Sequence, residues 1–155
     1  MIEVKLSEAI SAHRAFTRIG EADMPPTAAY RVGRLIAKLR SEQLAYQDAH
    51  VKLLKSKGGE SVGGGAAPPP EPVREKDEAD DAFAAREAAY KATMVEIADE
   101  LVTLMEQTVK IDYDPIPLKL FEKTEPDPSD PKVKVVKSNL KPNDMADVLP
   151  FIKEE

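Results

Sequence analysis

A seam of apolar residues that repeats every seven positions runs from Phe83 to Ile111. A strict seven-residue repeat is typical of a helix that lies along another helix for several turns. The pattern therefore predicts a long helix, from about Arg74 to Val109, that needs a helical partner. The repeat positions and the residues that fill the turns between them are Phe83, Tyr90, Met94, Ile97, Leu101, Leu104, Met105 and Ile111.

A second long seam precedes this one and predicts the partner helix. The Pro25-Pro26 pair predicts an extended corner, because the residue before a proline is kept out of helical space. After this corner, Thr27 is expected to cap a helix that runs to about Lys57. At about 1.5 Å per residue such a helix would span roughly 46 Å, so it needs a partner of similar length. Its apolar positions are Val32, Leu35, Ile36, Leu39, Tyr46, Ala49, Val51, Leu53 and Leu54.

The charges of the two expected helices are opposite. Residues 27–57 contain seven Lys or Arg and two acids, whereas residues 71–107 contain four Lys or Arg and eleven acids. Matched length and opposite charge favour an antiparallel pair. The sequence therefore predicts a mainly α (α+β) fold, in which a long, coiled-coil-like antiparallel hairpin is joined to a short N-terminal helix and a small β base.

Shorter elements occupy the two ends of the chain. A first helix is expected to be capped by Ser7 and to end at Gly20, which can take the left-handed conformation that ends many helices. A last helix is expected over Asp144–Leu149, capped by Asn143. Alternation of apolar and polar residues predicts the strands of the base. These strands are expected at Ile2–Leu6, Val109–Tyr113 and Val133–Val136.

Two segments rich in proline interrupt these elements. Residues 58–72 contain three consecutive glycines and three consecutive prolines, which predict a flexible linker at the tip of the hairpin. Residues 122–132 are rich in Pro and Asp and are expected to form a loop. At 155 residues the chain has the length of one domain, so residues 1–155 are predicted to form a single domain.

The composition limits the classes of protein to which this chain can belong. The net charge of -6 disfavours a nucleic-acid binder, because no excess of positive charge offsets phosphate repulsion. The absence of cysteine excludes disulfides and thiolate zinc sites. The first residues lack the basic and apolar blocks of a signal peptide, and no apolar run is long enough to cross a membrane. We therefore expect a cytoplasmic protein without a membrane partner.

Residues that could carry catalysis are few. His13 and His50 are the only histidines, and neither has a partner at a spacing typical of a metal site. Asp112 and Asp114 alternate on one expected strand, but no glycine turn or third ligand follows them. The sequence predicts no catalytic residue, cofactor or metal, and we expect a protein that is not an enzyme.

Basic residues gather near the start of the second helix. The simpler interpretation is a solvated face that lies opposite the acidic helix. The alternative is an anion site, for a phosphate or nucleotide ligand, close to the helix N-terminus at Thr27. No glycine-rich phosphate loop supports this alternative. The candidate anion contacts are Arg14, Arg18, Arg31, Arg34 and Lys38, with Arg40 on the same helix.

Some apolar residues lie beside the main seams. A two-helix hairpin buries one stripe on each helix, so further stripes predict an interface with another chain. We therefore expect a homo-oligomer with the long helices in its interface. The predicted interface residues are Ile36, Val51, Leu54, Met94, Leu101 and Met105.

Three stretches carry a resemblance to a known group of proteins. They are the helix start Tyr30–Leu39, the segment Val109–Ile116 and the terminal Leu140–Ile152. Together with a variable tip, this order resembles small uncharacterised helical-hairpin proteins encoded by bacteriophages and prophages. The resemblance implies a viral or prophage origin and brings no catalytic residue with it. The outline of two long helices on a strand base is also similar to prefoldin subunits, as an analogy of fold alone.

These observations predict a non-enzymatic phage protein that acts through protein–protein contacts or assembly as a homo-oligomer. Its further partner would be another phage or host protein, met in the host cytoplasm or in a virion. The first alternative is an anti-defence protein that sequesters a nucleotide signal at the arginine-rich site. The second alternative is a prefoldin-like chaperone subunit.

Overall fold

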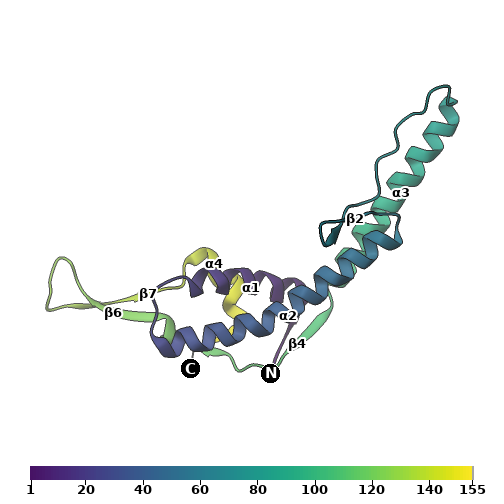
Figure 1. The fold of residues 1–155 in the computed structure, drawn as a ribbon. Helices are drawn as coiled ribbons and strands as arrows, with labels where there is room; N and C mark the ends of the chain where they lie inside the picture. The colour runs from purple at the N-terminus through teal and green to yellow at the C-terminus, as the bar shows by residue number, and fades with distance from the viewer. Residues whose placement is uncertain (155) are drawn as a thin grey trace. The chain divides into compact units, whose positions relative to one another are not determined.

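A computed structural model describes residues 1–154, which form two compact units (Figure 1). The first unit comprises Met1–Gln43 and the chain from Thr108 onward, and the second comprises Leu44–Gln107. The described part is mainly helical, with four α-helices and four small two-stranded sheets. None of its helices combines the length and apolarity needed to cross a bilayer.

The first unit begins with a strand and a helix, as predicted. Strand β1 (Ile2–Lys5) pairs antiparallel with β4 (Thr108–Ile111), so that Ile2 lies opposite Ile111. Helix α1 (Leu6–Gly20) follows directly, and the Glu8 carboxylate accepts a hydrogen bond of 2.7 Å from the Lys5 backbone N–H. The expected Ser7 cap is therefore wrong, because the helix already includes Leu6 and Glu8 satisfies a free N–H instead. Gly20 does end the helix, but without a positive φ angle.

Helix α2 (Pro26–Ser56) matches its predicted range to within one residue. Its first turn is closed by the Pro25 carbonyl, which accepts from the Ala29 N–H at 2.9 Å. Thr27 lies inside the first turn and is not the cap, because Pro26 takes the first helical position, where its missing N–H costs nothing. The two prolines thus set the start of the helix one residue earlier than expected.

Apolar side chains from both ends of the sequence form the core of the first unit. The Phe16 and Phe151 rings meet edge to face, with centroids 6.1 Å apart. Burying a large apolar side chain stabilises the fold by about 1.5–3 kcal/mol, so this cluster holds the unit together. Its fully buried members include Phe16, Val32, Leu35, Leu39, Ile116, Phe121, Val148 and Phe151.

The C-terminal part of the first unit contains more strand than predicted. Strand β6 (Glu122–Pro126) pairs antiparallel with β7 (Lys134–Ser138), so the loop expected over residues 122–132 is wrong before Asp127. Pro126 is tolerated because it ends its strand. Strand β5 (Ile116–Pro117) pairs in parallel with β8 (Ile152–Lys153), and single 3-10 turns occur at Leu118–Phe121 and Leu149–Phe151.

Helix α4 (Pro142–Val148) begins before the position predicted for it. Lys141 precedes the helix and Pro142 opens it, so Asn143 lies inside the first turn and cannot cap. Asp144, on the same turn, is only 7% exposed and accepts a hydrogen bond from the Arg18 guanidinium at 2.6 Å. This ion pair joins α4 to the end of α1.

In the second unit, helix α3 (Asp80–Met105) is shorter than the predicted 74–109. The acidic run before it forms a turn, in which Asp77 has a φ angle of 67°. Glu78 accepts two hydrogen bonds of 2.8 Å from Arg86, and Arg86 also donates to the Val73 carbonyl at 2.9 Å. These side-chain contacts hold the turn before the helix, which starts only at Asp80.

The end of α2 lies beside the C-terminal half of α3. Lys57 Nζ is 2.9 Å from a Glu96 carboxylate oxygen and 3.1 Å from a Glu100 oxygen. The first half of α3 has the preceding chain beside it instead, since the Arg74 guanidinium lies 6.0 Å from the centre of the Phe83 ring (Figure 1). The two long helices therefore meet over part of their length.

The tip contains an ordered β-hairpin where only a linker was predicted. Strands β2 (Ser61–Val62) and β3 (Gly65–Ala66) pair antiparallel around Gly63 and Gly64. Both glycines have positive φ angles, 50° and 86°, which a two-residue hairpin turn requires. The glycines that suggested flexibility are thus the residues that allow this turn.

Candidate functional sites

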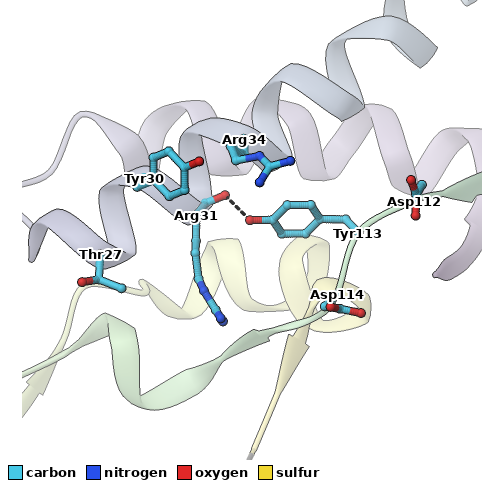
Figure 2. A pocket seen from close by; sticks show the side chains of 7 residues that line it. All are labelled: Thr27, Tyr30, Arg31, Arg34, Asp112, Tyr113 and Asp114. Carbon is cyan, nitrogen blue, oxygen red and sulfur yellow. Dashed lines mark hydrogen bonds between the residues drawn. The ribbon is translucent and has the colours of Figure 1, made fainter.

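An open cleft of about 460 Å³ lies where the first turns of α2 face the chain that follows β4 (Figure 2). It brings together two arginines of the predicted anion site, Arg31 and Arg34, with aromatic and acidic residues. We call it the tyrosine–arginine cleft. Its lining residues are Thr27, Tyr30, Arg31, Arg34, Asp112, Tyr113 and Asp114.

The helix α2 presents its polar side to this cleft because its apolar side is anchored. Val32 and Leu35 are buried in the core of the first unit, which turns the neighbouring polar residues outward. Tyr30 and Arg34 are one turn apart, and the Arg34 guanidinium lies 5.9 Å from the centre of the Tyr30 ring, within cation–π range. The Tyr30 side of the cleft thus combines a flat ring with a positive charge.

Tyr113 forms the opposite wall of the cleft. Its hydroxyl donates a hydrogen bond of 2.8 Å to the Arg31 backbone carbonyl, and its ring packs partly against the core (Figure 2). Its backbone N–H donates to the Ile111 carbonyl at 2.8 Å, which makes a tight turn directly after β4. Burial raises the pKa of the Tyr113 hydroxyl, so this group stays protonated and keeps its hydrogen bond near neutral pH.

Charges of both signs surround these rings. Asp112 is exposed and has only a long contact of 3.9 Å with Lys38. Among the residues that the structure describes, Arg31, Arg34 and Asp114 form no ion pair. The cleft therefore offers donors and acceptors that a ligand could use without first breaking a salt bridge.

The other predicted anion contacts do not line the cleft. Lys38 lies one turn beyond Arg34 and outside the lining of the cleft. Arg14 is exposed on α1, and Arg18 is engaged with the buried Asp144 in a separate cleft. Of the four arginines that the sequence grouped, the structure brings Arg31 and Arg34 into this cleft and leaves Arg14 and Arg18 outside its lining.

A second candidate site is the helical surface of the second unit. Between Leu44 and Gln107, only Leu54 and Ile97 are buried. The seven-residue seam of α3 does point inward, since its side chains are half-buried around Ile97. The opposite face of α3 is exposed and includes Val95 and Val102, which are 59% and 62% exposed.

The predicted interface residues divide into two groups. Ile36 packs partly against the core of the first unit, where its Cδ1 lies close to Gly20, and Leu54 is buried in the second unit. Leu54 is therefore not available to another chain, whereas Ile36 is half-buried and already packs within its own unit. The other four are half-buried: Val51, Met94, Leu101 and Met105. Val95 and Val102 were not included in the interface predicted from the sequence. Their spacing of seven residues could have indicated that they share one face of the helix.

Neither site contains the groups expected of a metal centre. In the described part of the chain, no three His, Asp or Glu side chains lie close enough together to hold a metal ion. A scan of protein-family models and searches of curated proteins and of solved structures find no match to this chain. The resemblance to phage proteins therefore stays a prediction.

Proposed function

We propose that the protein acts without catalysis, by self-association through the helices of its second unit. The observation that carries this proposal is the near absence of burial between Leu44 and Gln107, where only Leu54 and Ile97 are buried. A 26-residue helix with one buried side chain gains little from packing within its own chain. Association with another chain would supply the missing cover for its exposed valines.

A second copy of the same chain is the partner that the charges favour. The basic residues 27–57 and the acidic residues 71–107 belong to one chain, so two copies can each offer both surfaces. Lys57 is already paired with Glu96 and Glu100. Lys52 and Lys55 form no ion pair among the described residues and remain free to meet acids of a second chain.

The proposed interface includes some of the residues predicted from the sequence and adds the exposed face of α3. Met94, Leu101 and Met105 border it as half-buried residues, and Val95 and Val102 form its exposed centre on α3. In such an assembly the long antiparallel hairpin that the sequence predicts would be completed between chains. The resemblance to phage proteins suggests assembly of a larger particle as the setting for this role.

Sedimentation of the purified protein tests the proposal. The parent should sediment as a dimer or a larger symmetric species at micromolar concentration, well above the 17.0 kDa of one chain. A variant with Val95→Glu and Val102→Glu should sediment as a monomer with unchanged helix content, because both residues are exposed in the single chain. A parent that stays at the mass of one chain would overturn the proposal.

Val136→Glu provides the matched control for the double variant. Val136 is 63% exposed on β7, in the first unit, so this change adds a carboxylate at an equally exposed valine. It should leave the assembly intact. Equal effects of the control and of the α3 variant would mean that added negative charge, and not the α3 face, disrupts association.

A further inference from the structure

The tyrosine–arginine cleft combines three kinds of recognition group within one surface. Arg31 and Arg34 supply positive charge and several N–H donors each, and they lie three residues apart on α2. Tyr30 exposes most of its ring, and Asp114 supplies carboxylate acceptors across the cleft. The formal charges of the lining residues nearly cancel. A simple anion would therefore contact the arginines and leave the tyrosine ring and the carboxylates unused.

A ligand that matches the lining must carry an anion, a flat ring and hydrogen-bond donors. Guanidinium groups bind phosphate oxygens through paired N–H donors. An exposed tyrosine offers a stacking face to a base, and a carboxylate accepts from ribose hydroxyls or from the N–H groups of a base. We propose that the tyrosine–arginine cleft binds a mononucleotide, with its phosphate at Arg31 and Arg34, its base on Tyr30 and its sugar toward Asp114.

The fixed parts of the cleft support a defined site. Tyr113 is held by its hydroxyl bond to the Arg31 carbonyl and by its packing against the core, so one wall is set before any ligand arrives. The cleft volume of about 460 Å³ accommodates a ligand of this size. The side chains of Arg31, Arg34 and Tyr30 are exposed, so no packing prevents them from turning toward the ligand.

The cleft lies wholly in the first unit, so this inference does not depend on the proposed self-association. All seven lining residues belong to Met1–Gln43 or to the chain after Thr108. The variant with Val95→Glu and Val102→Glu should bind a nucleotide as the parent does. Failure of either proposal would therefore leave the other testable.

Calorimetric titration with AMP, ribose 5-phosphate, adenosine and inorganic phosphate tests the assignment. AMP should bind saturably, and adenosine and phosphate should each bind at least about tenfold more weakly, because each lacks one anchor. Arg31→Ala and Arg34→Ala should each weaken AMP binding by about tenfold or more, since each removes charged hydrogen bonds. Tyr30→Ala should weaken AMP binding by about fivefold or more and leave ribose 5-phosphate unchanged.

Arg14→Ala provides the matched control, because it removes the same charge from an exposed position outside the cleft. It should leave AMP binding within about twofold of the parent. Three results would overturn the inference: no saturable binding of AMP up to about 1 mM, phosphate binding as tight as that of AMP, or equal losses in Arg14→Ala and Arg31→Ala. Circular dichroism of each variant shows whether a loss of binding reflects a loss of fold.

Discussion

His13 shows how local surroundings set the behaviour of a single residue. His13 lies half-buried on α1, where burial and then the positive charges of Arg40 and Arg14 lower its pKa below 6.5. In the unfolded chain the same imidazole takes up a proton near pH 6.5. The unfolded state therefore binds more protons than the folded state as the pH falls below this value, and folding loses stability there.

This difference makes a prediction about pH. The free energy of unfolding, measured with urea, should be lower at pH 5.5 than at pH 7.5 and should change little above pH 7.5. His13→Gln should remove most of the decrease, because glutamine does not titrate. His50→Gln, which replaces the other histidine, serves as the control for the substitution itself. A parent with equal stability at both pH values would contradict the assignment of His13.

Single residues also show how far the sequence could identify the candidate cleft. Arg31 and Arg34 were predictable, because three-residue spacing on a helix places two side chains together. Tyr113 and Asp114 were not, since only the pairing of β4 with β1 brings their segment beside α2. The position of Arg18 outside the cleft could not be predicted either, because its ion-pair partner Asp144 lies 126 positions away in the chain.

At the scale of elements, the sequence located helices well where prolines and glycines set their ends. Helix α2 has both signals and was placed to within one residue. The start of α3 has no proline or glycine beside it. The acidic residues at positions 75–78 therefore resembled the first turn of a helix, where acidic residues are common. Arg86 favours the observed start, since its bonds to Glu78 and Val73 hold the chain before Asp80 in a turn that is not helical. The periodicity of apolar residues cannot predict such side-chain contacts between residues that lie several positions apart.

Two glycines offer a prediction at the scale of elements. A methyl group at Gly33, inside α2, would meet no atom within 4 Å, whereas one at Gly59 would collide with the carbonyl oxygens of Ala67 and Leu54. Gly33→Ala should therefore raise the free energy of unfolding by about 0.5–1 kcal/mol, because alanine favours helix. Gly59→Ala should lower it by about 1–3 kcal/mol, because the chain must shift around the added atom. Urea unfolding of both variants measures the difference.

Because the two substitutions should change the free energy of unfolding in opposite directions, together they test whether the tip packs as the structure shows. Both changes add one methyl group to the same residue type, so a general effect of alanine on the unfolded chain applies to both. If Gly59→Ala proved neutral or stabilising, the β2–β3 tip would not pack against the end of α2 as the structure has it. That result would return the tip to the flexible linker that the sequence predicted.

At the scale of the whole molecule, burial is divided unequally between the two units. Among the described residues, the first unit contains nearly all of the buried side chains, including the Phe16–Phe151 pair, whereas the only buried residues of the second are Leu54 and Ile97. Regions with few buried apolar contacts open at a lower cost in free energy than the core does. The first unit should therefore be the more stable of the two in a single chain.

Amide hydrogen exchange should reveal this division as a dependence on protein concentration. In dilute solution, the amides of α3 should exchange quickly, because a helix with one buried side chain opens easily. At a total chain concentration about 100 times the dissociation constant of a dimer, they should exchange about 15-fold more slowly, because only about 7% of the chains are then free monomers in which α3 can open. The amides of α1, whose apolar face is buried in the first unit, should exchange at the same rate in both conditions.

The variant with Val95→Glu and Val102→Glu separates association from the intrinsic stability of α3. It should show the rapid exchange of the dilute parent at every concentration, because the exposed face that meets the second chain carries the added charges. Slow exchange of α3 in the parent at the lowest measurable concentration would contradict the proposal. It would mean that the single chain already holds this helix, so that its exposed valines do not need a second copy for stability.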